Sequence, residues 1–277
     1  MSGRGFDDLV DNAGEADVGG WDFSWLDGRA TEERPPWGYV GLSAARVSAA
    51  AAVLDLQTGG GEVFGEVLTM TAARPRHVVA TESWPPNAAL ARENLAPFGV
   101  EVVEVGDPVD LPFETGSFDL VTSRHPVVVR WDEIARVLRP GGTYLAQHVG
   151  AGSNRELTDF LMGPQPVGDG RSPRRAVAEA EAAGLDVVDL REASLTVDFF
   201  DVGAVVFFLR KVLWTVPGFT VAAYRDRLFE LHELIGREGR FVSHAQRFLI
   251  EATKRPWRRG DVESTNFAGR AASDYAP

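Results

Sequence analysis

The segment at residues 53–62, VLDLQTGGGE, constrains the fold of this chain more than any other feature of its sequence. A short apolar run containing Asp55 leads into three consecutive glycines, and a helix-forming stretch follows. Glycine lets the backbone turn sharply and approach a ligand closely. In open α/β sheets, such a strand–turn–helix unit presents main-chain N–H groups at the crevice where ligands bind. The segment therefore predicts a parallel sheet with a ligand site at the carboxyl end of this strand.

The pattern after this segment alternates between strands and helices. Apolar runs of strand length recur between stretches with helical periodicity, which predicts a parallel sheet with helices on both faces. The predicted strands are residues 52–56, 77–81, 100–105, 118–123, 143–148, 185–197 and 241–253. The predicted helices are residues 43–51, 62–71, 86–96, 131–138, 172–183, 202–214 and 219–236. The fold class is thus α/β, a doubly wound, Rossmann-like, seven-stranded sheet.

The length of 277 residues suits one large α/β domain. Residues 1–20 are acidic and glycine-rich, and we expect them to be disordered. Residues 21–254 form the single domain, with an aromatic N-terminal cover at 21–42 and a helical insertion or lid at 198–238. The cover is either a lid over a ligand cleft or a wrap that closes one end of the sheet. Residues 255–277 are predicted to be a flexible tail.

Composition excludes several classes of protein. The net charge of −12 disfavours nucleic acid as a partner, because phosphate binding relies on Lys and Arg. The absence of cysteine rules out disulfides and Cys-ligated zinc or iron–sulfur clusters. No apolar run is long enough for a membrane span, and the N-terminal residues do not read as a secretory signal. A cytoplasmic location is therefore expected, while the sequence leaves the oligomeric state open.

An acidic residue follows the second predicted strand. Glu82 lies where a carboxylate can accept hydrogen bonds from both hydroxyls of a ribose. Enzymes that bind NAD carry such an acid as well. The glycine turn and Glu82 together predict a nucleoside-containing ligand without identifying it.

Two downstream motifs distinguish between the possible nucleoside-containing ligands. GDPVDLPFETGSFDLV at residues 106–121 and EIARVLRPGGTYLAQ at residues 133–147 follow in order. This series resembles the class I S-adenosylmethionine (SAM)-dependent methyltransferases of the small-molecule type, over residues 53–148. The resemblance implies SAM as the cofactor, a seven-stranded sheet whose last strand is antiparallel, and methyl transfer to oxygen or nitrogen of a small-molecule acceptor.

The resemblance also assigns roles to individual residues. Asp55 would orient the turn or meet the amino group of the methionine part of SAM. Gly59 and Gly61 would line its carboxypropyl and ribose parts, and Glu82 would hold the ribose hydroxyls. Asp107 would accept a hydrogen bond from the adenine amino group, and Pro108 would contact the adenine ring. Ser123 and Arg124 would face the methionine part of SAM or the substrate.

One residue departs from the family pattern. The pattern has its first glycine at position 57, where this chain has Gln57. Either the backbone keeps a negative φ there and the side chain hydrogen-bonds the cofactor, or SAM affinity is reduced. A third interpretation is that the domain has acquired another role.

Two histidines are candidates for a catalytic base. His125 and His148 follow or end predicted strands on the edge that would face the substrate, and histidine titrates near neutral pH. The alternative is that each hydrogen-bonds a loop carbonyl. Arg124 can pair with a substrate carboxylate or with a local acid such as Asp22.

Aromatic residues supply candidate substrate contacts. Trp37 and Tyr39 lie in the N-terminal cover, and Phe207 and Trp214 lie in the helical insertion. If they line a pocket, the acceptor is moderately apolar; otherwise they belong to the core. No residue pattern requires a metal.

Other functions remain alternatives. An RNA guanine methyltransferase of the ribosomal type shares the Leu-Pro-Phe and Pro-Gly-Gly elements but is disfavoured by the acidic charge. A second alternative is a protein with the SAM fold and a non-methylating catalytic or binding role, and its only support in the sequence is Gln57. An NAD(P)-dependent dehydrogenase fits the glycine spacing and the later motifs poorly.

Overall fold

One mixed sheet organises the molecule. The computed structural model describes residues 5–19, 22–106 and 110–256, and within these ranges eight strands form a sheet of order β1-β7-β8-β6-β5-β2-β3-β4. The parallel strands are β2 (Ala52–Leu56), β3 (His77–Glu82), β4 (Glu101–Glu104), β5 (Phe118–Arg124) and β6 (Leu138–Val149). The chain continues from β2 to β3 and β4 on one side and returns to β5 and β6 on the other. Between β2 and β5 lies the reversal at which α/β sheets bind ligands.

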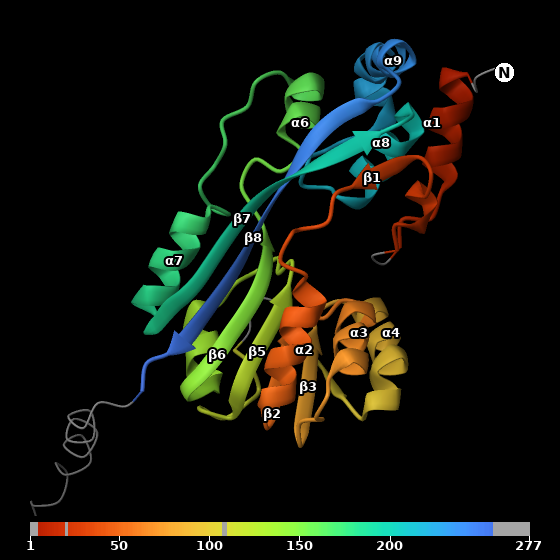
Figure 1. Cartoon of the computed structure of the whole chain (residues 1–277). Helices are drawn as coiled ribbons and strands as arrows, with labels where there is room; N and C mark the ends of the chain where they lie inside the picture. Colours follow the sequence, from red (N-terminus) through yellow and green to blue (C-terminus); the bar gives the residue numbers. More distant parts are fainter. Residues whose placement is uncertain (1–4, 20–21, 107–109, 257–277) are drawn as a thin grey trace, which may run out of the picture.

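An antiparallel hairpin extends the sheet beyond its parallel part. Strand β8 (Phe241–Lys254) pairs antiparallel with both β6 and β7 (Leu185–Phe199). The predicted antiparallel last strand is therefore confirmed. The pairing with β6 reaches only to Arg247, whereas β7 and β8 remain paired as far as Phe199 and Phe241. The far end of the hairpin thus projects past the carboxyl edge of the parallel strands (Figure 1).

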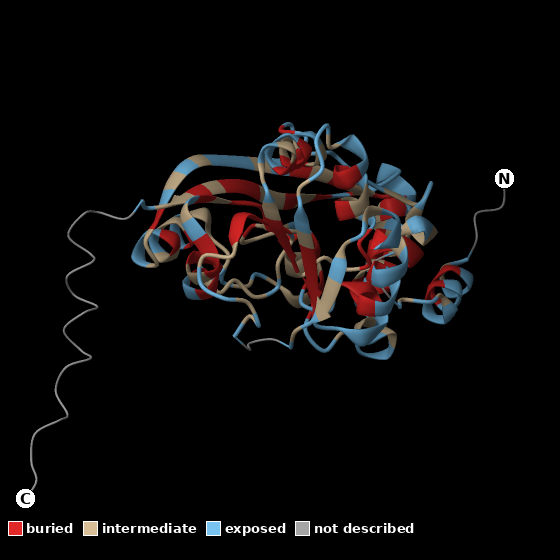
Figure 2. Ribbon diagram, turned by 90° about the horizontal axis from the view of Figure 1, so that it is seen from below, coloured by how far each residue is buried: buried red, intermediate tan, exposed pale blue. Residues whose placement is uncertain are grey.

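Helices cover both faces of the parallel strands, as predicted. On one face, α2 (Tyr39–Ala49), α3 (Glu62–Met70) and α4 (Pro85–Leu95) share a core with Val53, Ala80 and Leu120 of the strands. On the other face, α5 (Trp131–Val137) and α7 (Pro173–Ala182) pack on Leu54, Val79 and Val121. Consecutive residues of the central strands β2 and β5 therefore face different cores, and these two strands are buried on both sides (Figure 2).

A separate core lies around the projecting end of the hairpin. It is formed by α1 (Phe6–Glu15), α6 (Arg155–Met162), α8 (Val202–Lys211) and α9 (Val221–Glu238) against β7 and β8. Strand β1 (Ala30–Glu32) pairs with the end of β7. We call this assembly of α1, β1, α6, α8, α9 and the projecting part of the hairpin the cap. The predicted helical insertion at 198–238 supplies α8 and α9.

Two expectations about the N-terminal residues are wrong. The segment predicted to be disordered contains α1, in which Leu9, Val10 and Ala13 are buried against the cap. Their spacing gives an amphipathic helix, a periodicity that the acidic composition of the segment masks. The sheet also has eight strands instead of seven, because β1, only three residues long, pairs with the hairpin. The predicted flexible tail lies outside the described residues beyond Pro256.

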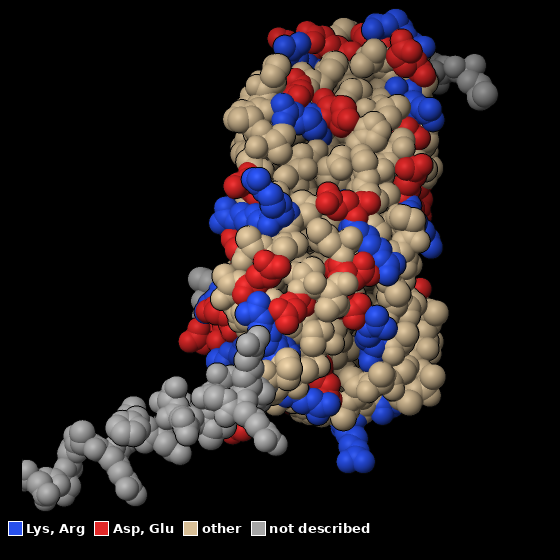
Figure 3. All heavy atoms as spheres, turned by 60° about the vertical axis from the view of Figure 1, so that its left-hand side comes forward, with Lys and Arg blue, Asp and Glu red and all other residues tan. Residues whose placement is uncertain are grey.

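The outer face toward β7 and α7 carries charges of both signs in alternation (Figure 3). Ion pairs of the hairpin include Arg46 of α2 with Glu251 of β8, and Arg191 with Asp189 within β7. No helix in the described ranges is long and apolar enough to cross a membrane.

Candidate active site

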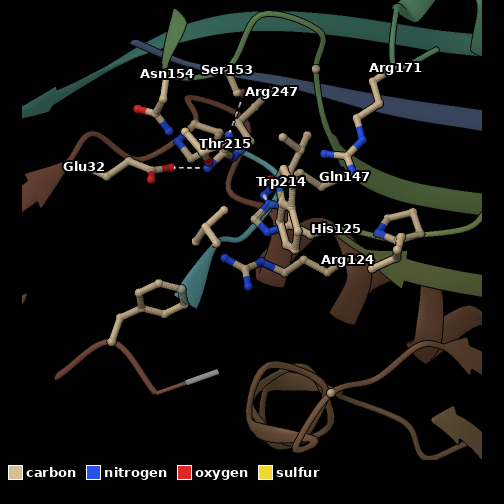
Figure 4. Close-up of a pocket in the computed structure, with 18 of the residues that line it drawn as sticks. Glu32, Arg124, His125, Gln147, Ser153, Asn154, Arg171, Trp214, Thr215 and Arg247 are labelled. Carbon is tan, nitrogen blue, oxygen red and sulfur yellow. Dashed lines mark hydrogen bonds and ion pairs between the residues drawn. The ribbon is translucent and has the colours of Figure 1, made fainter. Parts of the chain in front are cut away.

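A large cavity separates the parallel sheet from the cap. Its volume is about 1460 Å³, well above the roughly 300–1,000 Å³ of common ligand pockets. The walls of one end come from the segments 55–63 and 82–83, at the carboxyl ends of β2 and β3. The walls of the other end include residues 124–127, 149–155, 165–168 and 170–171, together with Gln147, Val197, Phe199, Phe208, Val212, Trp214, Thr215 and Arg247. We call these ends the glycine-turn half and the cap half; Figure 4 shows the cap half.

The glycine turn has the backbone geometry that its sequence predicts. Gly59 and Gly61 have φ values of 65° and 82°, which only glycine adopts readily. A Cβ on Gly60 would lie 2.7 Å from a methyl group of Leu90, and one on Gly61 would lie 2.9 Å from Leu95. The turn is therefore packed against α4 on one side, and Gly59 and Gly60 line the cavity on the other, whereas the predicted contact Gly61 is absent from the lining.

Glu82 is held at the end of β3 by three backbone donors. Its carboxylate accepts from the N–H of Gly59 at 2.8 Å, of Ser83 at 3.1 Å and of Trp84 at 3.0 Å. A carboxylate has about four lone-pair positions, so one remains for an external hydroxyl. The side chain lines the cavity and links the glycine turn to β3.

Asp55 lies deeper, under the glycine turn. Its carboxylate accepts from the Thr122 hydroxyl at 2.6 Å, and burial raises its pKa to about 6. Ser123, on the neighbouring strand, donates its hydroxyl to the carbonyl oxygen of Leu56 at 2.9 Å and is not among the cavity-lining residues. Of these two predicted contacts, Asp55 reaches the cavity and Ser123 supports the strands beneath it.

Gln57 differs from the sequence expectation. Its φ is 53°, so the backbone adopts the left-handed conformation of a glycine instead of a negative φ. Its side-chain oxygen accepts from Val127 N–H at 2.7 Å and Val128 N–H at 3.3 Å, and its amide nitrogen donates to the carbonyl oxygen of Val128 at 2.6 Å. Gln57 thus fastens the segment after β5 to the glycine turn, and its polar atoms are engaged by protein.

His125 is held in one protonation state by a chain of hydrogen bonds. The indole nitrogen of Trp37, which can only donate, bonds the side-chain oxygen of Gln147 at 2.7 Å. The amide nitrogen of Gln147 consequently faces Nε2 of His125, at 2.9 Å, and donates to it. Burial and the positive charges of Arg124 and Arg247 hold the pKa of His125 well below its usual value. The neutral ring therefore carries its proton on Nδ1 and has no lone pair available to act as a base.

His148 lies away from the cavity. Its ring stacks on Phe248 with centroids 4.6 Å apart, and its Nε2 is 3.3 Å from the Tyr144 hydroxyl. Burial lowers its pKa to about 3. Because it is absent from the cavity lining, this predicted catalytic candidate has a structural position in the core under α5.

The predicted aromatic contacts divide between cavity and core. Tyr39 and Trp214 line the cavity. Trp37 is buried behind Gln147, and Phe207 stacks on Trp25 within the cap core, with centroids 4.7 Å apart. Because successive helical residues point about 100° apart, Phe208 and not Phe207 lines the cavity. The N-terminal cover thus packs on the cap core and also contributes cavity walls.

Arginines dominate the cap half, and only Arg124 among them is predicted from the sequence. Arg124 extends from the end of β5, Arg171 from the segment before α7, and Arg247 from β8 (Figure 4). Arg247 is bound to Glu32 at 2.6 Å and to the Gln246 carbonyl oxygen at 3.0 Å. The predicted pairing of Arg124 with Asp22 is not formed. Nothing in the local sequence marks Arg171 or Arg247, because the segments that carry them meet only in the folded chain.

Two predicted cofactor residues, Asp107 and Pro108, lie outside the described residues. No group of three or more His, Cys, Asp or Glu side chains that could hold a metal occurs among the described residues.

The central part of the chain matches a known family. Residues 54–146 match the model of the methyltransferase domain family, a range that includes the glycine turn, Glu82 and both downstream motifs. This part of the chain is therefore similar to methyltransferase domains. The predicted resemblance, enzyme class and cofactor are confirmed at this level. No curated protein sequence matches the chain.

Solved structures share the fold of this chain. A candidate methyltransferase from Bacillus halodurans C-125 is 20% identical, with a TM-score of 0.53, covering 78% of this chain and 98% of its own. The YcgJ protein from Bacillus subtilis is 18% identical, with a TM-score of 0.53, covering 79% and 99%. The [4+2]-cyclase SpnF is 17% identical, with a TM-score of 0.50, covering 90% and 94%. At these identities the similarity establishes the fold alone.

The glycine-turn half fits SAM. Ser43 and Thr58 line it with buried hydroxyl oxygens that have no hydrogen-bond partner within the described residues. Buried polar atoms without partners are rare in folded proteins, so such atoms in a cavity wall indicate a bound polar ligand. Together with the remaining acceptor position on Glu82, they match the hydroxyl and amino groups of the cofactor.

Proposed function

We propose that this chain transfers the methyl group of SAM to oxygen or nitrogen of a small molecule bound in the cap half of the cavity. The observation that carries the proposal is the continuity of the cavity from the glycine turn to the cap. Val197, Phe199 and Phe208 give the cap half apolar walls. A cavity roofed in this way suits a compact acceptor better than an RNA.

The residues of the chain bind and orient the two reactants. Glu82 accepts from a ribose hydroxyl, and the glycine turn lets the backbone lie against the rest of the cofactor. Asp55 faces the same space from below. When bound, SAM supplies an electrophilic methyl group. The cap excludes water and holds the acceptor in line, and such positioning contributes much of the rate in two-substrate reactions.

The site favours an acceptor that is already nucleophilic at neutral pH. The lone pair of His125 is occupied by Gln147, and the Tyr39 hydroxyl donates to the Ser123 carbonyl oxygen at 3.1 Å. Glu32 is paired with Arg247. His125 therefore serves as an N–H donor toward the acceptor and not as the base that the sequence suggested.

The proposal is tested by calorimetric titration of the purified protein with SAM and with S-adenosylhomocysteine. Micromolar binding of both is expected, followed by release of S-adenosylhomocysteine when an acceptor is supplied. Glu104→Ala is the matched control for replacement of Glu82 by Ala, because Glu104 ends the neighbouring strand β4 and pairs with Arg92 outside the cavity. Absence of binding at millimolar concentrations of both ligands would refute the proposal.

Gln57 supports a second candidate, a non-methylating role on the same fold. Its left-handed backbone would be relaxed by glycine, which the family has at this position. The two candidates differ in the fate of the cofactor: methyl transfer consumes SAM, whereas a non-methylating role leaves it intact. Chromatographic quantification of SAM after turnover separates them.

A further inference from the structure

Two arginines in the cap half have no acidic partner. Neither the Arg124 nor the Arg171 guanidinium has a hydrogen bond or ion pair with any described residue, although both line the cavity. By contrast, Arg155, in the same lining, pairs with Asp159 at 2.7 Å, and Arg247 pairs with Glu32. Five donor N–H groups on each unpaired guanidinium thus remain for a ligand.

The acids near these arginines are engaged or exposed. Glu32 is bound to Arg247, and the Glu33 carboxylate accepts from the N–H of Thr196 at 2.7 Å. Asp22 accepts from the N–H of Ser24 at 2.8 Å; it, Asp27 and Glu66, whose charge also acts on Arg124, are exposed. The wall around His125 is therefore net positive, which agrees with the depressed pKa of that histidine beside Arg124 and Arg247.

The surroundings of the two arginines are apolar and aromatic. The Arg171 guanidinium carbon lies 5.4 Å from the centre of the Trp214 ring, within the range of a cation–π contact. Phe199, Phe208 and Val212 complete this part of the lining. A planar donor fork beside an apolar wall matches a carboxylate on a hydrophobic body, because guanidinium groups bind carboxylates bidentately.

We propose that Arg171, beside Trp214, binds the carboxylate of an apolar organic acid, which is the small-molecule substrate, while Arg124 adds a second positive charge to the wall of the same cavity. Identifying this acid as the substrate rests on the proposed function, whereas the binding site for the acid is a property of the cap half alone. A carboxylate is ionised at neutral pH, so such a ligand needs no base from the protein in order to bind.

The test is calorimetric titration with hydrocinnamate and octanoate, with their uncharged amides as controls. The acids are expected to bind and the amides to bind at least about tenfold more weakly. Arg171→Ala is expected to weaken acid binding about ten- to hundredfold, the range for a lost hydrogen bond between charged groups. Arg171→Lys keeps the charge but loses the fork and should recover only part of the affinity.

Arg174→Ala is the matched control, because Arg174 is exposed at the start of α7 and outside the cavity lining. It removes the same charge three residues away and should leave acid binding unchanged. Circular dichroism establishes that the variants fold. Equal binding of acid and amide, or acid binding unaffected by Arg171→Ala, would overturn the proposal. Displacement of the acids by equimolar inorganic phosphate would also overturn it, since the site would then select a bare anion.

A second titration separates the substrate from the cofactor as the source of the carboxylate, because SAM has one in its methionine part. With S-adenosylhomocysteine saturating, the acids are expected to bind as well as before. If S-adenosylhomocysteine abolishes acid binding, the arginines hold the cofactor and the inference fails while methyl transfer stands. If neither SAM nor S-adenosylhomocysteine binds but the acids do, the proposed function fails and the acid site stands.

Discussion

The two halves of the cavity are built in different ways. The glycine-turn half comes from two short stretches, residues 55–63 and 82–83, at the ends of adjacent parallel strands. The cap half gathers residues from the N-terminal cover, the end of β5, the segment after β6 and three later segments of the chain. The first half is bound together by backbone hydrogen bonds to Glu82, whereas the second is held by side chains of distant segments. This difference predicts that cofactor binding and cap stability respond to separate substitutions.

The largest effect is expected at Glu82. Replacement of Glu82 by Ala removes the ribose acceptor and leaves three backbone N–H groups without their partner. SAM affinity should fall about hundredfold or more, and the free energy of unfolding should fall by about 2 kcal/mol, given about 1–3 kcal/mol for unsatisfied buried donors. Titration calorimetry and urea denaturation measure the two effects. Unchanged SAM affinity would show that the glycine-turn half is not the cofactor site.

The next effect concerns pH and Asp55. Burial raises its pKa from 3.8 to about 6 in the folded protein, so folding favours the protonated carboxyl. This contribution to stability is fully present below about pH 4 and is lost as the pH rises through about 6. The shift corresponds to about 3 kcal/mol at most. Asp55→Asn keeps an acceptor for Thr122 and should therefore be more stable than the wild type above about pH 6.

Urea denaturation across this pH range measures the Asp55 prediction. The difference between the variant and the wild type should disappear toward acidic pH. A variant that is less stable at alkaline pH, with the difference growing as the pH rises, would contradict it.

A smaller effect is expected in the cap. Asp201 binds Arg29 through two hydrogen bonds of 2.7 and 2.8 Å and accepts from the N–H of Ala204 at the start of α8. Asp201→Ala should lower the free energy of unfolding by about 2 kcal/mol, through the lost helix cap and the partly buried unpaired arginine. SAM affinity should not change. A loss of SAM affinity comparable to that of Glu82→Ala would show that the two halves are not independent.

The smallest effect is expected at Gln57, where the two halves meet. Gln57→Gly relieves the left-handed backbone but frees the segment at Val127 and Val128 from the glycine turn. We expect SAM affinity to fall about tenfold, equivalent to the loss of about one net hydrogen bond. Gln57→Glu is a useful companion, because it keeps the length of the side chain and removes the donor to Val128. A marked rise in affinity for the glycine variant would instead indicate a degraded site.

Local sequence patterns were sufficient for the parallel sheet and the glycine-turn half. Apolar runs of strand length gave β2 to β6, because buried parallel strands need apolar residues on both faces. Three consecutive glycines required the left-handed turn found at Gly59 and Gly61. The position of Glu82 followed from the end of its strand. Each of these features depends on residues close together in the chain.

The structure of the cap could not be predicted from local sequence patterns. Strand β1 has only three residues and exists because the end of β7 is available to pair with it. Helix α1 was hidden by an acidic composition, although its apolar face packs on α8. Whether Phe207 or Phe208 lines the cavity depends on the rotation of α8 against the hairpin, which no local pattern specifies.

The sequence by itself determined the doubly wound sheet, the glycine turn and the class of enzyme, because these depend on periodicity and on backbone conformations that few residues allow. Only the tertiary structure decided that neither His125 nor His148 is available as a base in the cavity, and which arginines lack an acidic partner. His125 is neutral and occupied because Trp37 fixes Gln147 from a position 110 residues away in the chain. Arg171 is unpaired because folding brings it to Trp214 and to no carboxylate of the described chain. Charge and protonation at a site depend on what surrounds a side chain, and those neighbours are assembled from distant segments.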